Sequence, residues 1–314
     1  MTGTISTAVE SPTARAIVRT LLYFEIFSYP LTAEEVFRFS TCPDATFEKD
    51  FERLQNLVRQ GVVFQFGHFY QTQNDPTWAQ RRLDCNHRAD SLLPIARRIA
   101  RFIGAFPFIK GVFVSGSLSK HCMSADSDID FFLITESGRL WLARTLLVLF
   151  KKIFLFNSHK YFCVNYFVDT GHLEIEEKNL FTATETVTLL PMYGREWYAA
   201  FCDANRWAWE QYPNISLRPV EGVPQESRPL LKKMFEWILN GKVGDWLDAK
   251  AMHLTVGFWR KKFGHLDQNT FNVALKSRRY VSKHHPLHFQ EKVLATFERR
   301  VDEMKCKSAE GSLI

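Results

Sequence analysis

The feature that most constrains the fold is a pair of short apolar segments joined by a polar loop. Residues 111–115 (GVFVS) and 130–135 (DFFLIT) have the aromatic and β-branched composition of buried strands. The loop between them opens with Gly-Ser and closes with Asp-x-Asp. Residues 161–168 form a third predicted strand, and helical patterns precede and follow this region. The sequence therefore predicts an α+β protein whose strands lie mainly near the middle of the chain.

The length of 314 residues predicts more than one compact unit, because a single core rarely grows that large. We divide the chain into an N-terminal unit with a frayed start (1–76), a mixed α/β core with a leading helix (77–180), and a helical C-terminal domain (181–314). From Thr182 onward the pattern predicts helices, interrupted by a proline-containing loop over residues 212–228.

The N-terminal unit shows three helical segments between residues 14 and 59, followed by two short strands within residues 62–72. Thr32 and Glu35 have the spacing of a capping box for the second helix. Three helices followed by a β-hairpin resemble the order of a winged helix. The third helix, residues 47–59, carries charges of both signs, which favours protein docking or packing over nucleic-acid binding.

Composition narrows the class of protein. The net charge of +6 weakly favours an anionic ligand such as a nucleotide or a nucleic acid. Six scattered cysteines without a C-x-x-C pair, and a start without the features of a targeting signal, predict reduced thiols and a cytoplasmic protein. The most apolar run, residues 140–156, is broken by Arg144 and by Lys151-Lys152. We therefore expect no membrane partner.

The polar loop has the parts of a site for a metal-bound triphosphate. Asp128 and Asp130 are two residues apart, so on a strand both carboxylates leave the same face. Such a pair repels itself unless a cation lies between, and hard oxygen ligands suit Mg²⁺. Gly116 allows a close backbone approach, Ser117 offers an amide and a hydroxyl, and Lys120 adds positive charge for phosphate.

Gly116-Ser117, followed ten residues later by Asp128-Ile129-Asp130 and an apolar strand, resembles the signature of the polymerase-beta-type nucleotidyltransferase superfamily. The resemblance covers roughly residues 112–176. It implies that the two aspartates bind Mg²⁺ (or Mn²⁺), that the Gly-Ser turn holds the phosphates of an NTP, with ATP expected, and that a third carboxylate activates an acceptor hydroxyl. The implied enzyme transfers a nucleoside monophosphate and releases pyrophosphate.

Two positions depart from that signature. Many relatives have glycine where this loop has His121, which we interpret as a structural residue. The position of the third acid is matched by Asn165, whose carbonyl can still bind a metal. Asp169, Glu174 and Glu176 remain alternatives for that role. Without any general base, the rate would fall by about 10²- to 10⁴-fold.

Cations for the leaving pyrophosphate are expected from the C-terminal part. The densest basic cluster is Arg278, Arg279, Lys283 and His284-His285, and the next is Arg260-Lys261-Lys262; for any single residue a solvated surface remains the alternative. Trp207, Trp209, Trp237, Trp246 and Trp259 are interpreted as core residues rather than base-stacking ones.

Three functions remain open from the sequence. Nucleotidyl transfer to a small molecule, a protein or a nucleic-acid end is the first. The second is a catalytically inactive nucleotide-binding or regulatory protein that uses its winged-helix-like unit to bind DNA or a protein. The third is an enzyme specific for nucleic-acid ends, which predicts salt-sensitive RNA or DNA binding.

Overall fold

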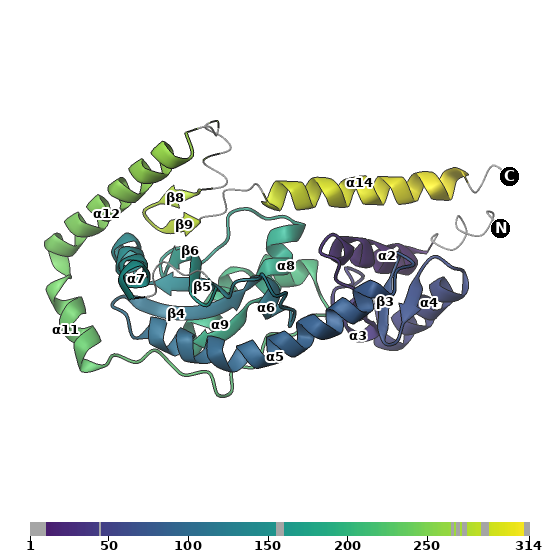
Figure 1. Cartoon of the computed structure of the whole chain (residues 1–314), viewed down its shortest axis with the longest axis horizontal. Helices are drawn as coiled ribbons and strands as arrows, with labels where there is room; N and C mark the ends of the chain where they lie inside the picture. The colour runs from purple at the N-terminus through teal and green to yellow at the C-terminus, as the bar shows by residue number, and fades with distance from the viewer. Residues whose placement is uncertain are drawn as a thin grey trace.

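The computed structural model combines a central sheet with helices on both of its sides (Figure 1). It describes residues 11–43, 45–154, 160–264, 267, 271, 275–283 and 289–310, without the side chains of 306–310. The prediction of mixed helix and sheet is confirmed. No helix in these ranges is both long and apolar enough to cross a membrane.

The central sheet has six strands in the order β7-β4-β5-β6-β9-β8. Strand β5 pairs antiparallel with β4 and parallel with β6, so it lies in the middle of the sheet. The three strands predicted from sequence are confirmed as β4, β5 and β6. The strands are β4 (Ile109–Ser115), β5 (Asp130–Thr135), β6 (Cys163–Asp169), β7 (Leu190–Tyr193), β8 (Ser277–Arg278) and β9 (Val281–Lys283).

The expectation that the chain is helical throughout from Thr182 is wrong, because β7, β8 and β9 come from this part. The proline at position 191 is tolerated because β7 is an edge strand, where a missing amide breaks few ladder bonds. Residues 173–176 lie in the loop between β6 and the next helix. Residues 77–180 and 181–314 thus build one sheet together rather than two separate cores.

The N-terminal unit has the predicted order of three helices and a hairpin. The capping box of Thr32 and Glu35 is confirmed, with both reciprocal hydrogen bonds present. A short additional strand, β1, pairs with β3 to give the sheet order β1-β3-β2. The elements are α2 (Pro12–Glu25), β1 (Leu31–Thr32), α3 (Ala33–Arg38), α4 (Phe47–Arg59), β2 (Phe64–Phe66) and β3 (Phe69–Gln71).

The remaining helices surround the sheet and connect it to the N-terminal unit. Figure 1 shows α14 running back along the molecule to the N-terminal unit. Val293, Phe297 and Val301 of α14 pack into the same apolar cluster as α2. The helices are α5 (Thr77–Gly104), α6 (Gly116–Ser119), α7 (Leu140–Phe154), α8 (Leu180–Thr188), α9 (Arg195–Ala204), α10 (Arg206–Gln211), α11 (Leu230–Ile238), α12 (Gly241–Lys262) and α14 (Phe289–Glu310).

A buried arginine joins α5 to the N-terminal unit. The side chain of Arg82 on α5 is only 3% exposed. Its guanidinium forms a salt bridge of 2.7 Å with Glu35, donates to the Pro30 carbonyl at 2.8 Å, and lies 3.6 Å from the ring centre of Tyr29. The Tyr29 hydroxyl in turn donates to the carbonyl of Lys120 at 2.5 Å. The N-terminal unit therefore contacts the loop that follows Gly116.

We predict that Arg82→Met lowers the free energy of unfolding by about 3 kcal/mol, because it leaves the carboxylate of Glu35 without its buried partner. Arg81→Met is the matched control, since Arg81 is exposed on the same helix, and it should change stability by less than about 0.5 kcal/mol. Urea denaturation measures both. Equal losses in the two variants would contradict a stabilising role for the buried pair.

Candidate functional site

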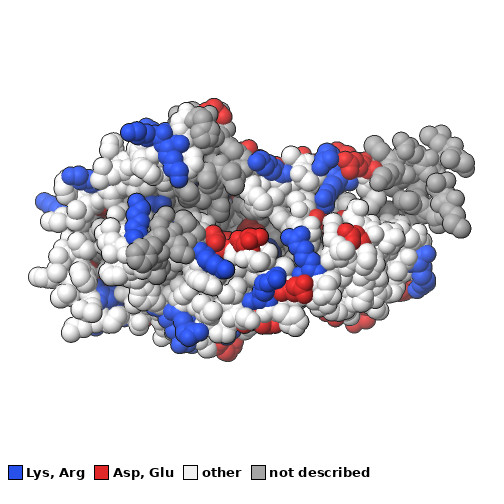
Figure 2. Space-filling model, viewed as in Figure 1, with Lys and Arg blue, Asp and Glu red and all other residues white. Residues whose placement is uncertain are grey.

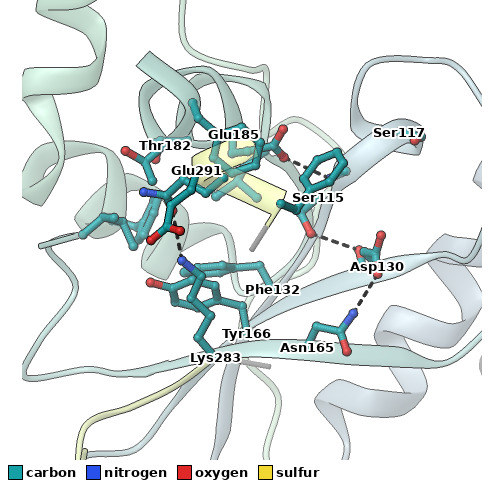
Figure 3. A pocket seen from close by; sticks show the side chains of 18 residues that line it. Ser115, Ser117, Asp130, Phe132, Asn165, Tyr166, Thr182, Glu185, Lys283 and Glu291 are labelled. Carbon is teal, nitrogen blue, oxygen red and sulfur yellow. Dashed lines mark hydrogen bonds between the residues drawn. The ribbon is translucent and has the colours of Figure 1, made fainter. Parts of the chain in front are cut away.

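A cavity of about 370 Å³ opens beside the sheet where β4 ends and β5 and β6 begin (Figure 3). Its wall is largely aromatic and aliphatic, with one set of polar groups near the end of β4 and another at Lys283, Gln290 and Glu291. The lining residues are Ser115, Gly116, Ser117, Asp130, Phe132, Asn165, Tyr166, Ile175, Phe181, Thr182, Glu185, Thr186, Leu189, Phe201, Lys283, Phe289, Gln290 and Glu291. Such an apolar pocket with a few convergent polar groups is typical of small-molecule sites.

Gly116 and Asp130 meet because β4 and β5 are antiparallel neighbours. Ser115, the last residue of β4, lies opposite Asp130, the first residue of β5. Gly116 then turns the chain with a φ of +65°, and a Cβ there would lie 2.8 Å from Oδ2 of Asp130. A side chain at this position would be strained twice, by the left-handed backbone and by the carboxylate. The close approach that the structure shows at Gly116 is to the carboxylate of Asp130, and the expected approach of a phosphate to this backbone stays a prediction.

Asp128 differs from its expected position. The strand β5 begins at Asp130, so Asp128 lies in the loop before it and does not line the cavity. Buried Ile129 between them exchanges backbone hydrogen bonds with Lys160 and Cys163, at 3.0 and 3.2 Å. The two acids therefore flank a buried residue that pairs with the segment leading into β6. Of the two, only Asp130 lines the cavity.

The carboxyl of Asp130 is held in an environment that disfavours its charge. Burial raises the pKa of Asp130 to about 6, and the negative charges of Asp128 and Glu185 act in the same direction. Asn165 on β6 donates from Nδ2 to Oδ1 of Asp130 at 3.0 Å, which opposes the rise (Figure 3). Among the described residues no salt bridge brings a positive charge to this acid, as expected of a carboxylate that binds a cation or acts on a proton.

The structure brings Asn165 to Asp130 and leaves the alternative third acids elsewhere. Asp169, at the far end of β6, accepts a hydrogen bond from Ser137 and pairs with His172. Glu174 forms a salt bridge with Lys178, and Glu176 forms one with Lys276. None of these three acids lines the cavity.

Glu185, whose carboxylate accepts hydrogen bonds from the donors of the Gly-Ser loop, was not identified from the sequence. Glu185 on α8 accepts from the Gly116 amide at 3.3 Å through Oε2, and from Nζ of Lys120 at 2.7 Å through Oε1. Lys120 also donates to the Gly116 carbonyl at 3.1 Å. Two of the three expected phosphate ligands therefore hold an anionic group of the chain itself, while the third, Ser117, is exposed. The only sequence signal was a single acid in an otherwise uncharged helix.

One member of the predicted basic cluster reaches the cavity. Lys283 is buried, its Nζ donates to Oε1 of Gln290 at 3.1 Å, and burial lowers its pKa. Arg278 instead pairs with Glu176 outside the cavity, and His284-His285 lie outside the described residues. None of the tryptophans considered for base stacking lines the cavity, and Trp237 and Trp246 are exposed rather than in the core.

His121 has a backbone conformation that glycine adopts easily. Its φ is +57°, in the left-handed region that favours glycine, and its ring nitrogen lies 3.1 Å from a carboxylate oxygen of Asp90. The loop thus takes the backbone conformation that glycine would allow, while the side chain pairs outside the cavity. This agrees with a structural role for His121.

A complete metal site is not present in the protein atoms alone. Among the described residues, no group of three or more His, Cys, Asp or Glu side chains could hold a metal ion. Asp128, Asp130 and the Asn165 carbonyl could supply oxygen ligands, which is a set that Mg²⁺ commonly completes with substrate phosphates and water.

No family model matches the chain, and no curated protein or solved structure gives a significant match.

We predict that Gly116→Ala destabilises the protein more than Gly61→Ala does. Both glycines have left-handed φ values, +65° and +71°, but a Cβ meets Asp130 only at position 116 and has open space at 61. The control should lose about 1 kcal/mol from the backbone term alone, and the Gly116 variant should lose clearly more. Thermal and urea unfolding provide the comparison, and identical losses would argue against close packing of the two residues.

We also predict that Asp130→Asn changes how stability depends on pH. The pKa of Asp130 is raised from 3.8 to about 6, so the folded state keeps a proton that the unfolded chain has lost. The resulting stabilisation is present below about pH 4 and lost as the pH rises through about 6. The asparagine variant should lack this loss, so its stability relative to wild type should increase over that range.

Urea unfolding at several pH values tests this. Asp126→Asn is the control, because Asp126 is an exposed acid in the same loop. If the stability difference between Asp130→Asn and wild type stays constant from pH 4 to 7, the carboxyl of Asp130 is not held in its protonated form by the fold.

Proposed function

We propose that this protein is a nucleotidyltransferase that moves a nucleoside monophosphate from an NTP, with ATP expected, to a hydroxyl acceptor and releases pyrophosphate. The observation that carries the proposal is the meeting of Gly116, Asp130 and Asn165 at one mouth of the cavity, with an anion-binding pair of donors beside them. The sequence signature and this geometry point to the same residues.

The contact of Glu185 supports an anion-binding role for the loop. The amide of Gly116 and the ammonium of Lys120 already hold two carboxylate oxygens. A phosphate group of the nucleotide offers more oxygens and more charge to the same donors, and it would take the place of Glu185 there. Glu185 would then turn its carboxylate toward another group in the cavity, which keeps a negative charge near the acceptor.

The acids would hold the metal that the nucleotide brings. Asp128 and Asp130 are the expected ligands of Mg²⁺ or Mn²⁺, and Asn165 holds the carboxylate of Asp130 in position. The bound ion would neutralise charge on the phosphates during transfer. Ionised Asp130 is required for this role, so the raised pKa favours binding above about pH 6.

The rest of the cavity suits a ring system. Phe132, Tyr166 and Phe201 belong to its wall, and Lys283 lies at its edge with Gln290. Flat apolar walls can bind a nucleobase or an apolar acceptor by stacking and burial, without hydrogen bonds specific to one base. We assign the cavity as the place where the nucleoside or the acceptor lies during the reaction.

A second candidate function is a nucleotide-binding regulatory protein without activity. The observation that favours it is Asn165 at the third-acid position, together with the remote positions of Asp169, Glu174 and Glu176. In that case the site binds the nucleotide, but no carboxylate on β6 activates an acceptor. Besides Asp130, the described acids that line the cavity are Glu185 and Glu291. Glu185, which contacts Gly116, would serve as the base in the enzyme and would have no such role in the regulatory protein.

We propose a docking role for the winged-helix-like unit. The exposed side of α4 carries Glu48 and Glu52 beside Lys49 and Arg59, which leaves little net charge for phosphate contacts. On the face shown in Figure 2, blue and red side chains are mixed over this unit. These features favour a protein partner or internal packing over a nucleic acid.

We predict that Asp130→Asn abolishes metal-dependent NTP binding while Asp126→Asn leaves it unchanged. Titration calorimetry of the full chain with ATP, in the presence of Mg²⁺ or Mn²⁺, measures binding without knowledge of the acceptor. Pyrophosphate release is recorded in parallel, and any release should fall by about 10²-fold or more in Asp130→Asn, since a group acting on transition-state charge is lost.

The outcomes separate the candidates. Binding with pyrophosphate release supports the enzyme, and binding without release supports the regulatory protein. Wild-type protein that binds none of the four NTPs with either metal would refute both functions.

A further inference from the structure

Helix α11 is docked on the molecule through its polar side. Lys232 is 1% exposed and its Nζ donates to the carbonyls of Gly104 and Ile109, at 3.0 and 2.6 Å. Glu236, one turn further, accepts from the amide of Phe108 at 2.8 Å. These bonds satisfy backbone groups at the corner between α5 and β4, where charged partners are more strongly bound than neutral ones.

The consequence is that the apolar side of α11 faces outward. Trp237 is 81% exposed, and it shares the outward side of the helix with further large apolar side chains. An amphipathic helix of a globular protein normally buries that side. The exposed apolar residues of α11 are Leu230, Leu231, Met234, Phe235, Trp237 and Ile238.

The next helix continues the same surface. On α12 four exposed apolar side chains, Val243, Trp246, Leu254 and Phe258, follow one another at helical spacing along one side. The other side packs on α7, where Asp248 accepts from the Leu142 amide at 2.8 Å. In the described part of the chain eighteen large apolar side chains are exposed, and ten of them belong to these two helices. The exposed apolar surface is therefore concentrated rather than scattered.

Basic residues surround this apolar surface. The exposed charges of α11 and α12 are six cations and one carboxylate, Asp245, which is itself paired with Arg139. Figure 1 shows the two helices along one outer edge of the molecule, and at that edge Figure 2 shows mainly white atoms with blue ones among them. The cations are Lys233, Lys242, Lys250, Arg260, Lys261 and Lys262.

We propose that α11 and α12 form a surface that binds an anionic lipid bilayer at its interface. Exposed Trp, Phe and Leu side chains enter the boundary between headgroups and acyl chains, and the surrounding Lys and Arg side chains attract anionic headgroups. This proposal departs from the expectation of no membrane partner, which was drawn only from the lack of a membrane-spanning run. No described helix could span a membrane, but a helix that lies in the interface needs no span. The surface lies apart from the cavity and does not depend on the proposed reaction.

Charge decides between a bilayer and a second copy of the chain. A symmetric dimer through this surface would bring six cations of one copy against six of the other, with one paired carboxylate on each side. The two helices also form an outer edge rather than a groove (Figure 1). A lipid bilayer is fluid and can deform around a protruding pair of helices, whereas a protein partner would need a groove of matching shape.

Flotation of the full chain with lipid vesicles tests the proposal. Vesicles of phosphatidylcholine alone are compared with vesicles of phosphatidylcholine mixed with phosphatidylglycerol, at low and high salt. We expect binding to the anionic vesicles only, weakened by salt because screening shortens the reach of the lysines. The double variant Trp237→Ser/Trp246→Ser should bind at least about tenfold more weakly, since it removes two large apolar anchors.

Leu217→Ser is the matched control, because Leu217 is 58% exposed, as Trp246 is, but lies outside the two helices. It should bind like wild type, and circular dichroism should show that all variants are folded. The proposal is overturned if the chain does not float with anionic vesicles at low salt, or if the tryptophan variant floats equally well. It is also overturned if sedimentation shows a wild-type dimer that the tryptophan variant dissociates, or if vesicle binding is unchanged when Lys250 and Lys261 are replaced by Glu.

Discussion

The pairing of β5 with two different neighbours fixes the candidate site. Antiparallel pairing with β4 puts the turn at Gly116 beside the first residue of β5, and parallel pairing with β6 brings Asn165 to the same end. Reversal of either neighbour would move one of these groups to the opposite edge of the sheet. The chemistry proposed for Asp130 therefore depends on the register of three strands more than on any single contact.

The local part of this arrangement was predictable from the sequence. The strands β4, β5 and β6 are short, strongly apolar runs, and such runs are buried whichever fold contains them. The turn at Gly116 and the acid at Asp130 flank a single loop, so their proximity needs only that the two strands pair. The capping box of Thr32 and Glu35 is likewise a matter of neighbouring residues.

The remainder required information on long-range packing. Strands β7 and β9 are four and three residues long, too short for a period of two to stand out, and their pairing comes from distant parts of the chain. Glu185 reaches the loop from a helix 69 residues after Gly116. For α11 the periodicity predicted a helix but not its orientation, because Lys232 and Glu236 point inward to bind backbone groups at the corner between α5 and β4.

The hydrogen bond from Tyr29 to Lys120 has a consequence for how the parts of the molecule communicate. The acceptor carbonyl belongs to the residue whose side chain holds Glu185, and the donor belongs to a unit 91 residues earlier in the chain. Movement of α2, α3 and α4 would free one peptide plane to rotate. A ligand held by the N-terminal unit would in this way set the stiffness of the loop across from Asp130, and a chain shortened to begin at α5 would lose that restraint entirely.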